Sequence, residues 1–134
     1  MKFSTRSSYG LRALALLAKQ YGKKPYPLAK IAVTERISQS YLERLFARLK
    51  KAGIVASSKG VAGGYQLTYK PSQISILSVI EALEGSITVF KCLSRQGNMV
   101  CTKTGCPSGR VYLKVQKALL QSLKSMTLAD LIKK

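Results

Sequence analysis

The feature that most constrains this chain is a helix with one apolar and one basic side, followed at once by a glycine-containing hairpin. In residues 38–52, apolar side chains recur at helical spacing and basic side chains fill the opposite side. Gly53 then provides a left-handed stop. A shorter helix is predicted over residues 27–33, opened by Pro27. Two helices joined by a short turn, the second with a basic outer face, indicate a helix-turn-helix unit that fits a DNA major groove.

The segment after this helix predicts a wing. Residues 54–56 and 65–69 alternate as strands do, and residues 57–64 between them are rich in Ser and Gly. Lys59 is the only charged residue of the tip. Gly60, Gly63 and Gly64 are expected to allow positive φ angles and a close backbone approach to a sugar-phosphate chain. A hairpin with a basic tip directly after a recognition helix is typical of a winged helix.

Helical periodicity also predicts helices over residues 5–21, 72–84, 108–126 and 127–132. The expected fold is therefore mainly α: a winged helix-turn-helix DNA-binding domain with a two-stranded wing and a long C-terminal dimerisation helix. We expect a DNA-binding region at 1–70 and a second region at 71–134, which holds a sensor loop (86–107) and the dimerisation helix (108–126). That helix carries more apolar surface than so small a chain can cover, which favours a homodimer.

The net charge of the chain limits the classes of binding partner. The 134 residues include 23 Lys and Arg against 5 Asp and Glu, a formal net charge of +18. Fourteen of the basic residues and two of the acidic ones lie in residues 1–70, so a polyanion is expected to bind the first half. The absence of His excludes His-based catalytic triads and HExxH metalloproteases, and no other catalytic constellation is visible, so no enzyme is expected. No apolar run is long enough for a membrane span, and we expect a cytoplasmic protein that binds no membrane.

Several motifs together resemble a known family. They are residues 1–4 with 9–14 (MKFS, YGLRAL), 27–32 (PLAKIA), 38–46 (SQSYLERLF) and 59–65 (KGxxGGY). In this combination the chain resembles the bacterial winged-helix regulators of the IscR, NsrR, RirA and CymR type over essentially its whole length. The resemblance implies a dimeric transcription factor, a repressor by expectation, that binds a palindromic operator in double-stranded DNA. In many members a [2Fe-2S] cluster on three loop cysteines modulates that binding.

The candidate DNA-binding residues divide by the part of DNA they would meet. Base edges are expected for the start of the recognition helix, at Ser38, Gln39, Ser40 and Tyr41. Phosphates are expected for Arg44, Arg48 and Lys51, and a minor groove for Lys59, where the family commonly has Arg. Glu43 has two compatible interpretations. It can reject wrong sequences by repelling DNA unless it meets a cytosine amine, a discrimination linked to the matching Glu in IscR-like proteins, or it can form a capping box with Ser40.

Three cysteines, Cys92, Cys101 and Cys106, are spaced C-x8-C-x4-C in the sensor loop. Three thiolates on one loop suit an iron–sulfur cluster or another thiophilic metal, and the resemblance favours [2Fe-2S]. The fourth ligand stays unassigned. The His that follows the third Cys in IscR is replaced here by residues 107–110 (PSGR), and the Asp that NsrR uses from the partner's first helix corresponds to Ser8.

Three alternatives remain open at this stage. The cysteines could act as a cluster-free thiol or metal switch, or they could be inert. A metabolic enzyme could dock on the dimer and control it, as in the CymR-like branch. The charge of +18 would also suit a nonspecific, nucleoid-type DNA binder.

Overall fold

The computed structural model describes residues 3–90, 93, 98 and 106–133. In chain order the elements are α1 (Thr5–Lys19), α2 (Leu28–Glu35), α3 (Gln39–Lys51), β1 (Val55–Ser58), β2 (Gly64–Leu67), the 3-10 turn η1 (Pro71–Gln73), α4 (Ile76–Glu84), α5 (Ser108–Ser125) and α6 (Leu128–Leu131). This mainly helical winged fold is the one that the sequence predicts. Among the described residues, no helix is both long enough and apolar enough to cross a membrane.

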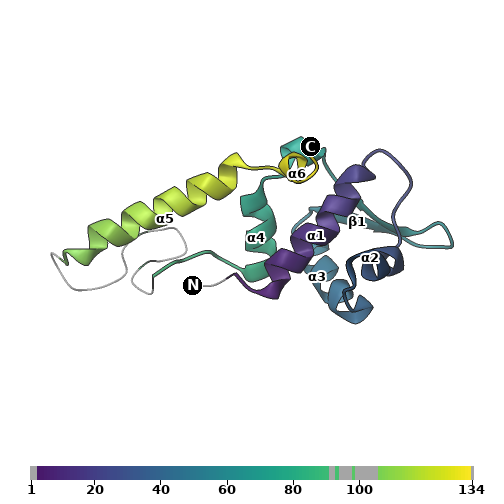
Figure 1. Cartoon of the computed structure of the whole chain (residues 1–134), viewed down its shortest axis with the longest axis horizontal. Coiled ribbons are helices and arrows are strands. Elements are labelled where there is room, and N and C mark those ends of the chain that lie inside the picture. Colours follow the sequence, from purple (N-terminus) through teal and green to yellow (C-terminus); the bar gives the residue numbers. More distant parts are fainter. Residues whose placement is uncertain (1–2, 91–92, 94–97, 99–105, 134) are drawn as a thin grey trace.

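Helices α1 to α4 pack around one apolar core (Figure 1). Leu14, Leu42, Phe46 and Leu83, one or two from each of three helices, are fully buried. The ring of Phe46 also packs edge-on against Tyr65 of β2, with centroids 4.8 Å apart. The core thus fixes α3 and the wing in one rigid unit. Helix α4 contributes to this core, so residues on both sides of position 70 share it, and the division at that position stays a proposal.

The wing is an antiparallel pair in which Val55 lies opposite Leu67 and Ser58 opposite Gly64. The pairing is shifted slightly from the prediction, because Ser57 and Ser58 join the first strand and the second strand ends at Leu67. Tyr26, in the connection between α1 and α2, extends the sheet: its backbone exchanges two hydrogen bonds of 2.9 Å with Tyr65. This bridge fastens the base of the wing to the helical unit.

The long helix α5 reaches away from the other helices (Figure 1). It returns to them at its C-terminal end, where Leu123 of α5 and Leu128 of the following α6 are buried in the shared core. A backbone bridge between Ser75 and Thr127 holds α6 against the start of α4. The predicted helices over 108–126 and 127–132 are confirmed with ends shifted by one residue, whereas the predicted helix over 72–84 is split into η1 and α4.

Candidate nucleic-acid interface

The start of α3 presents polar side chains, and Ser38 is its N-cap. The Ser38 hydroxyl accepts a 3.4 Å hydrogen bond from the backbone N–H of Tyr41 and lies 2.9 Å from the hydroxyl of Ser40. The predicted capping box between Ser40 and Glu43 is therefore wrong, because the helix begins two residues before the box requires. Glu43 is exposed and has no hydrogen bond or ion pair to another described residue. The capping interpretation of Glu43 is thus wrong, and its role toward DNA stays a prediction.

Gln39, Ser40 and Glu43 are exposed on one end of α3, whereas Tyr41 is half-buried against α1. The Tyr41 hydroxyl lies 3.0 Å from that of Thr5, and its ring packs edge-on against Tyr9. Arg44 is exposed, and its guanidinium lies over the ring of Tyr41, 5.4 Å from the centroid. Tyr41 therefore sets the position of α3 on α1 and carries Arg44 on its outer side.

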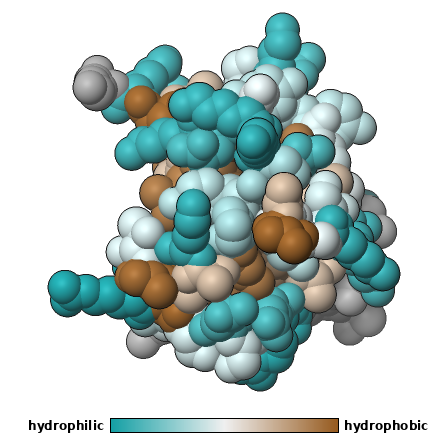
Figure 2. All heavy atoms as spheres, turned by 90° about the vertical axis from the view of Figure 1, so that its right-hand side faces the viewer, coloured by the Kyte–Doolittle hydropathy of each residue, from teal (hydrophilic) through white to brown (hydrophobic). Residues whose placement is uncertain are grey.

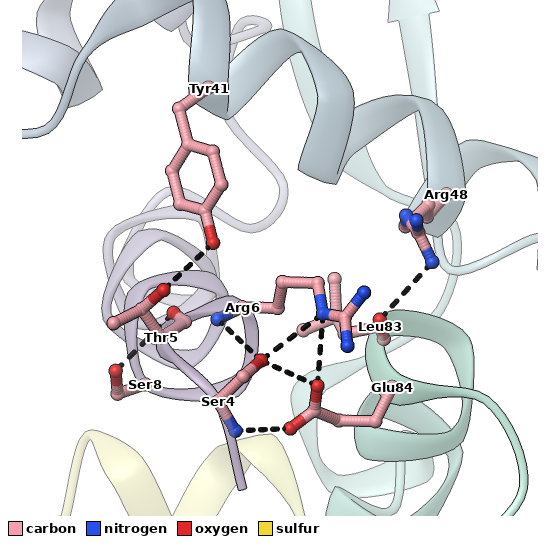
Figure 3. Close-up of polar contacts among 8 residues, drawn as sticks. All are labelled: Ser4, Thr5, Arg6, Ser8, Tyr41, Arg48, Leu83 and Glu84. Atoms are coloured by element: carbon pink, nitrogen blue, oxygen red, sulfur yellow. Dashed lines mark hydrogen bonds and ion pairs between the residues drawn. The ribbon is translucent and has the colours of Figure 1, made fainter.

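The basic face of α3 is anchored at two points. Nη1 of Arg48 donates to the backbone carbonyl of Leu83 at 3.4 Å, which joins α3 to the end of α4 (Figure 3). Lys50 donates to the Ser57 hydroxyl at 2.7 Å, which joins α3 to the wing. Lys51 is exposed. The structure thus brings Arg44, Arg48 and Lys51 onto the exposed side of one helix, as the sequence predicts, while the Arg48 and Lys50 side chains also brace it.

The wing carries Lys59 at an exposed tip. Gly60 has φ +106°, a conformation that L side chains rarely adopt. Gly63 and Gly64 have negative or extended φ, and the expectation of positive φ is wrong for them. A Cβ on Gly63 would collide with the backbone of Ser58, and one on Gly64 with the backbone of Tyr26. These two glycines are required for packing within the protein. Figure 2 shows the end of the molecule that bears the wing, where hydrophilic side chains surround a few hydrophobic ones.

A carboxylate at the end of α4 organises the start of α1, a feature that sequence reasoning missed. Glu84 accepts hydrogen bonds from the Ser4 backbone N–H at 2.5 Å and the Ser4 hydroxyl at 2.6 Å, and it pairs with Nε of Arg6 at 3.0 Å (Figure 3). Burial alone would raise the pKa of the Glu84 carboxyl, but the bonds from Ser4 and Arg6 outweigh it and hold the pKa below the ordinary value. One signal was available: Arg6 places a cation in the first turn of a helix, where the macrodipole disfavours it unless an anion lies nearby.

Residues 87–90, just before the first cysteine, are attached to α5 by side-chain contacts. The Gln116 side chain, 2% exposed, accepts from the Val89 N–H at 2.9 Å and donates to the Ile87 carbonyl. Phe90 stacks on Tyr112 of α5 with centroids 4.0 Å apart. A displacement of residues 87–90 would therefore act directly on the position of α5.

Cys106 is half-buried just before α5, and Cys92 and Cys101 lie outside the described residues. No group of three or more potential metal ligands occurs within the part of the chain that the structure describes. The Glu84 carboxylate, which could otherwise donate an oxygen to a metal, is already engaged by Ser4 and Arg6. The chain's donor set is thus three thiols without a His, which fits three of the four positions of an iron–sulfur site.

A helix-turn-helix with an exposed basic second helix and a wing defines a winged-helix DNA-binding protein. Residues 3–134 match the family described as Rrf2, iron-dependent transcriptional regulator. The chain is 34% identical to the HTH-type transcriptional regulator IscR of Aliivibrio salmonicida over 98% of its own length and 77% of that protein. The chain therefore belongs to the Rrf2 family of transcriptional regulators, which are not enzymes.

Solved structures agree with this assignment. The structure of CymR, titled the global cysteine regulator of B. subtilis, superposes with a TM-score of 0.81 at 35% identity, covering 98% of this chain and 95% of that one. The oxidized form of Staphylococcus aureus CymR gives a TM-score of 0.78 at 31% identity, covering 100% and 98%. The mainly helical fold of this chain, with its two-stranded sheet, thus matches solved structures of CymR.

Proposed function

We propose that two copies of the chain pair through α5 and bind a palindromic operator in double-stranded DNA, one α3 in each of two major grooves. The observation that carries this proposal is the exposed side of α3. Gln39, Ser40 and Glu43 lie at the end that would meet base edges, and basic side chains follow along the same helix. Arg44, Arg48 and Lys51 would meet phosphates, and Lys59 of the wing would enter or follow a minor groove. Ser38 and Tyr41 contribute mainly by fixing the start of α3, and Gly60, Gly63 and Gly64 by shaping the wing.

Pairing through α5 is supported by the distribution of its side chains. Tyr112, Gln116 and Leu123 face the rest of the chain. At helical spacing from each other on another side, Val111 and Val115 are 57% and 42% exposed. An apolar stripe of this kind on a helix of 18 residues matches a subunit interface with twofold symmetry.

The test of DNA recognition is selection of binding sites from a library of random duplexes, followed by affinity measurements on the selected and an unrelated duplex. We expect a palindrome whose half-sites are centred about 34 Å apart, and affinity that falls steeply with salt. Gln39→Ala should relax the sequence preference, whereas Lys51→Gln should weaken binding to both duplexes by a similar factor. Equal affinity for both duplexes in the wild type would contradict the proposal and favour a nonspecific DNA binder.

For control, we propose that Cys92, Cys101 and Cys106 hold a [2Fe-2S] cluster, with a fourth ligand from outside this set. Such a cluster would supply an iron centre sensitive to redox state and to oxygen. The family's description as iron-dependent and the thiol donor set support the proposal. The contacts made by Gln116 and Phe90 connect residues 87–90, which precede the cysteines, to α5. The state of the cysteines can therefore alter how α5 packs against the α5 of the second copy.

Protein purified without oxygen tests this control. We expect visible absorption with about two iron and two sulfide per chain, and a change in operator affinity when the cluster is removed. The triple variant Cys92→Ser, Cys101→Ser, Cys106→Ser should be colourless and bind with one affinity in air and without it. Equal affinity of the loaded wild type and the triple variant at every salt concentration would contradict cluster control.

A second candidate is control by thiol chemistry without a cluster. It is favoured by the similarity to the structure titled as the oxidized form of S. aureus CymR. An iron-free wild type whose operator affinity changes on reversible oxidation, and whose triple variant does not respond, would support it. Control by a docked metabolic enzyme gains no support from the described residues.

A further inference from the structure

The start of α1 and the middle of α3 line an open basic pocket of about 300 Å³ beside the predicted DNA-binding face. Its lining consists of Ser4, Thr5, Arg6, Tyr41, Arg44, Leu45 and Arg48. Three guanidinium groups and three side-chain hydroxyls, from the start of α1 and from α3, thus converge on one hollow. None of the side chains of α1 belongs to the set that the sequence predicts for DNA binding.

The guanidinium groups of this pocket are held in place and keep N–H groups that make no hydrogen bond to a described residue. Arg6 uses only Nε for its bonds to Ser4 and Glu84, and its two terminal nitrogens have no hydrogen-bond partner among the described residues. Arg44 is fixed over the Tyr41 ring without a hydrogen bond to any residue that the structure describes. Arg48 contributes Nη1 to Leu83 and keeps its other nitrogens. Preorganised, unused N–H groups of this kind lower the cost of binding an anion.

The balance of charge selects an anion. Among the described residues, Glu84 is the one carboxylate with a hydrogen bond or ion pair to the lining, and it binds Ser4 and Arg6 from the α4 side, at a side-chain exposure of 5%. Three guanidinium groups against one carboxylate leave the pocket positive. The forked geometry of Arg matches phosphate oxygens in particular. Because Thr5, Arg44 and Arg48 are exposed, the remainder of a bound molecule would project into solvent.

We propose that this pocket holds a backbone phosphate of the DNA that α3 reads, with Thr5 and Arg6 of α1 and Arg44 and Arg48 of α3 as its ligands. The inference rests on the proposed function, since α3 must lie in a major groove for the pocket to meet the flanking strand. It extends the DNA-binding surface from α3 to α1. It also makes Glu84 a positioning residue, because its bond to Nε holds the Arg6 guanidinium and leaves both terminal nitrogens without a partner among the described residues.

Arg6→Gln tests the pocket through the salt dependence of binding. Removing one cation that binds a phosphate should reduce the slope of log affinity against log salt by about 1, with the selected and unrelated duplexes weakened by a similar factor. The matched control is Lys19→Gln, an exposed cation at the other end of α1, which should leave the slope unchanged. An unchanged slope for a folded Arg6→Gln protein would overturn the proposal.

Two further variants decide the matter if Arg6→Gln fails to fold. Arg6→Lys keeps the charge but loses the fork, so it should keep the slope and weaken binding to both duplexes. Thr5→Val removes a pocket hydroxyl together with its contact to the Tyr41 hydroxyl, and it should weaken both duplexes equally, again at an unchanged slope. Wild-type affinity in both variants would contradict the assignment.

Inorganic phosphate distinguishes DNA from a free anion as the ligand. If phosphate at matched ionic strength raises the melting temperature of the wild type but not of Arg6→Gln, while the DNA salt slope of the two is equal, the pocket holds a free anion and the DNA assignment is wrong. If the wild type prefers no sequence and Arg6→Gln still lowers the slope, the pocket stands and only sequence-specific recognition fails.

Discussion

Helices α1 and α5 differ in how much of each the chain itself buries. Six of the 15 residues of α1 are buried, whereas only three of the 18 residues of α5 are. Helix α1 lies against the core of α3 and α4, and α5 contacts the same core mainly near its C-terminal end. The unit of α1, α3 and α4 thus has its core within one chain, while α5 presents apolar surface that the described residues leave uncovered.

Helices α1 and α5 are also joined to α4 and the segment that follows it in different ways. Glu84 at the end of α4 binds the start of α1 through a carboxylate with several partners. The segment that follows is held on α5 by one neutral side chain, Gln116, and one aromatic stack. Charge-assisted bonds are the stronger kind. The comparison therefore predicts a firm α1–α3–α4 unit and a more easily displaced connection to α5.

The largest change in stability should come from a substitution in the core shared by α1, α3 and α4. Phe46→Ala removes a fully buried ring and should lower the free energy of unfolding by about 3–5 kcal/mol. Urea unfolding measures this loss. The control Val33→Ala changes a side chain that is 79% exposed and should stay within about 0.5 kcal/mol of the wild type. Similar losses in the two variants would show that the core is not where the fold places it.

Glu84→Gln should have the next largest effect. Because the bonds from Ser4 and Arg6 lower the pKa of the carboxyl, the charged form stabilises the fold above the unfolded pKa, and this contribution is lost as the pH falls through the folded pKa. We expect a loss of about 1–3 kcal/mol at pH 7, and a smaller difference from the wild type once the pH falls below the ordinary value of 4.5. Glu81→Gln, exposed on the same helix, is the control; a pH-independent difference for Glu84→Gln would contradict the assignment.

Arg36→Gly should give a smaller effect of opposite sign. Arg36 ends α2 at φ 56° and ψ 46°, a left-handed conformation that costs a residue with a Cβ about 1 kcal/mol. Glycine should recover about that amount, and Arg36→Ala, which keeps the Cβ, should recover little. Thermal or urea unfolding measures the stability of the two variants. Equal stability of Arg36→Gly and Arg36→Ala would show that the left-handed conformation of Arg36 is not strained.

Sequence reasoning succeeded where local pattern and core agree, and it failed where contacts join distant residues. The periodicity of Leu42, Leu45 and Leu49 sufficed to find α3, and the Gly-rich tip sufficed to find the wing. The helix over 38–52 was placed to within one residue, but its cap was assigned to Ser40, because Ser38 and Ser40 are both good caps and only the packing of Tyr41 on α1 distinguishes them.

The candidate site shows the same limit. Arg44, Arg48 and Lys51 could be found because they share one helical face. The contribution of α1 could not, because Arg6 and Glu84 are 78 residues apart and meet only in the folded chain. Gly64 was recognised as necessary, but the cause could not be: a Cβ there would collide with the backbone of Tyr26, which lies in the distant connection between α1 and α2.

The central claim is that α5 pairs two self-sufficient DNA-binding units, and Val115→Asp tests it most directly. The measurement is the ratio of affinities for the selected palindrome and for a duplex with a single half-site. The wild type should strongly prefer the palindrome, since both α3 helices engage at once. Val115→Asp should abolish that preference yet keep the affinity for the half-site, while Gln121→Asp, a carboxylate on the polar side of α5, should behave as the wild type. A Val115→Asp protein that still prefers the palindrome as strongly as the wild type would contradict the account.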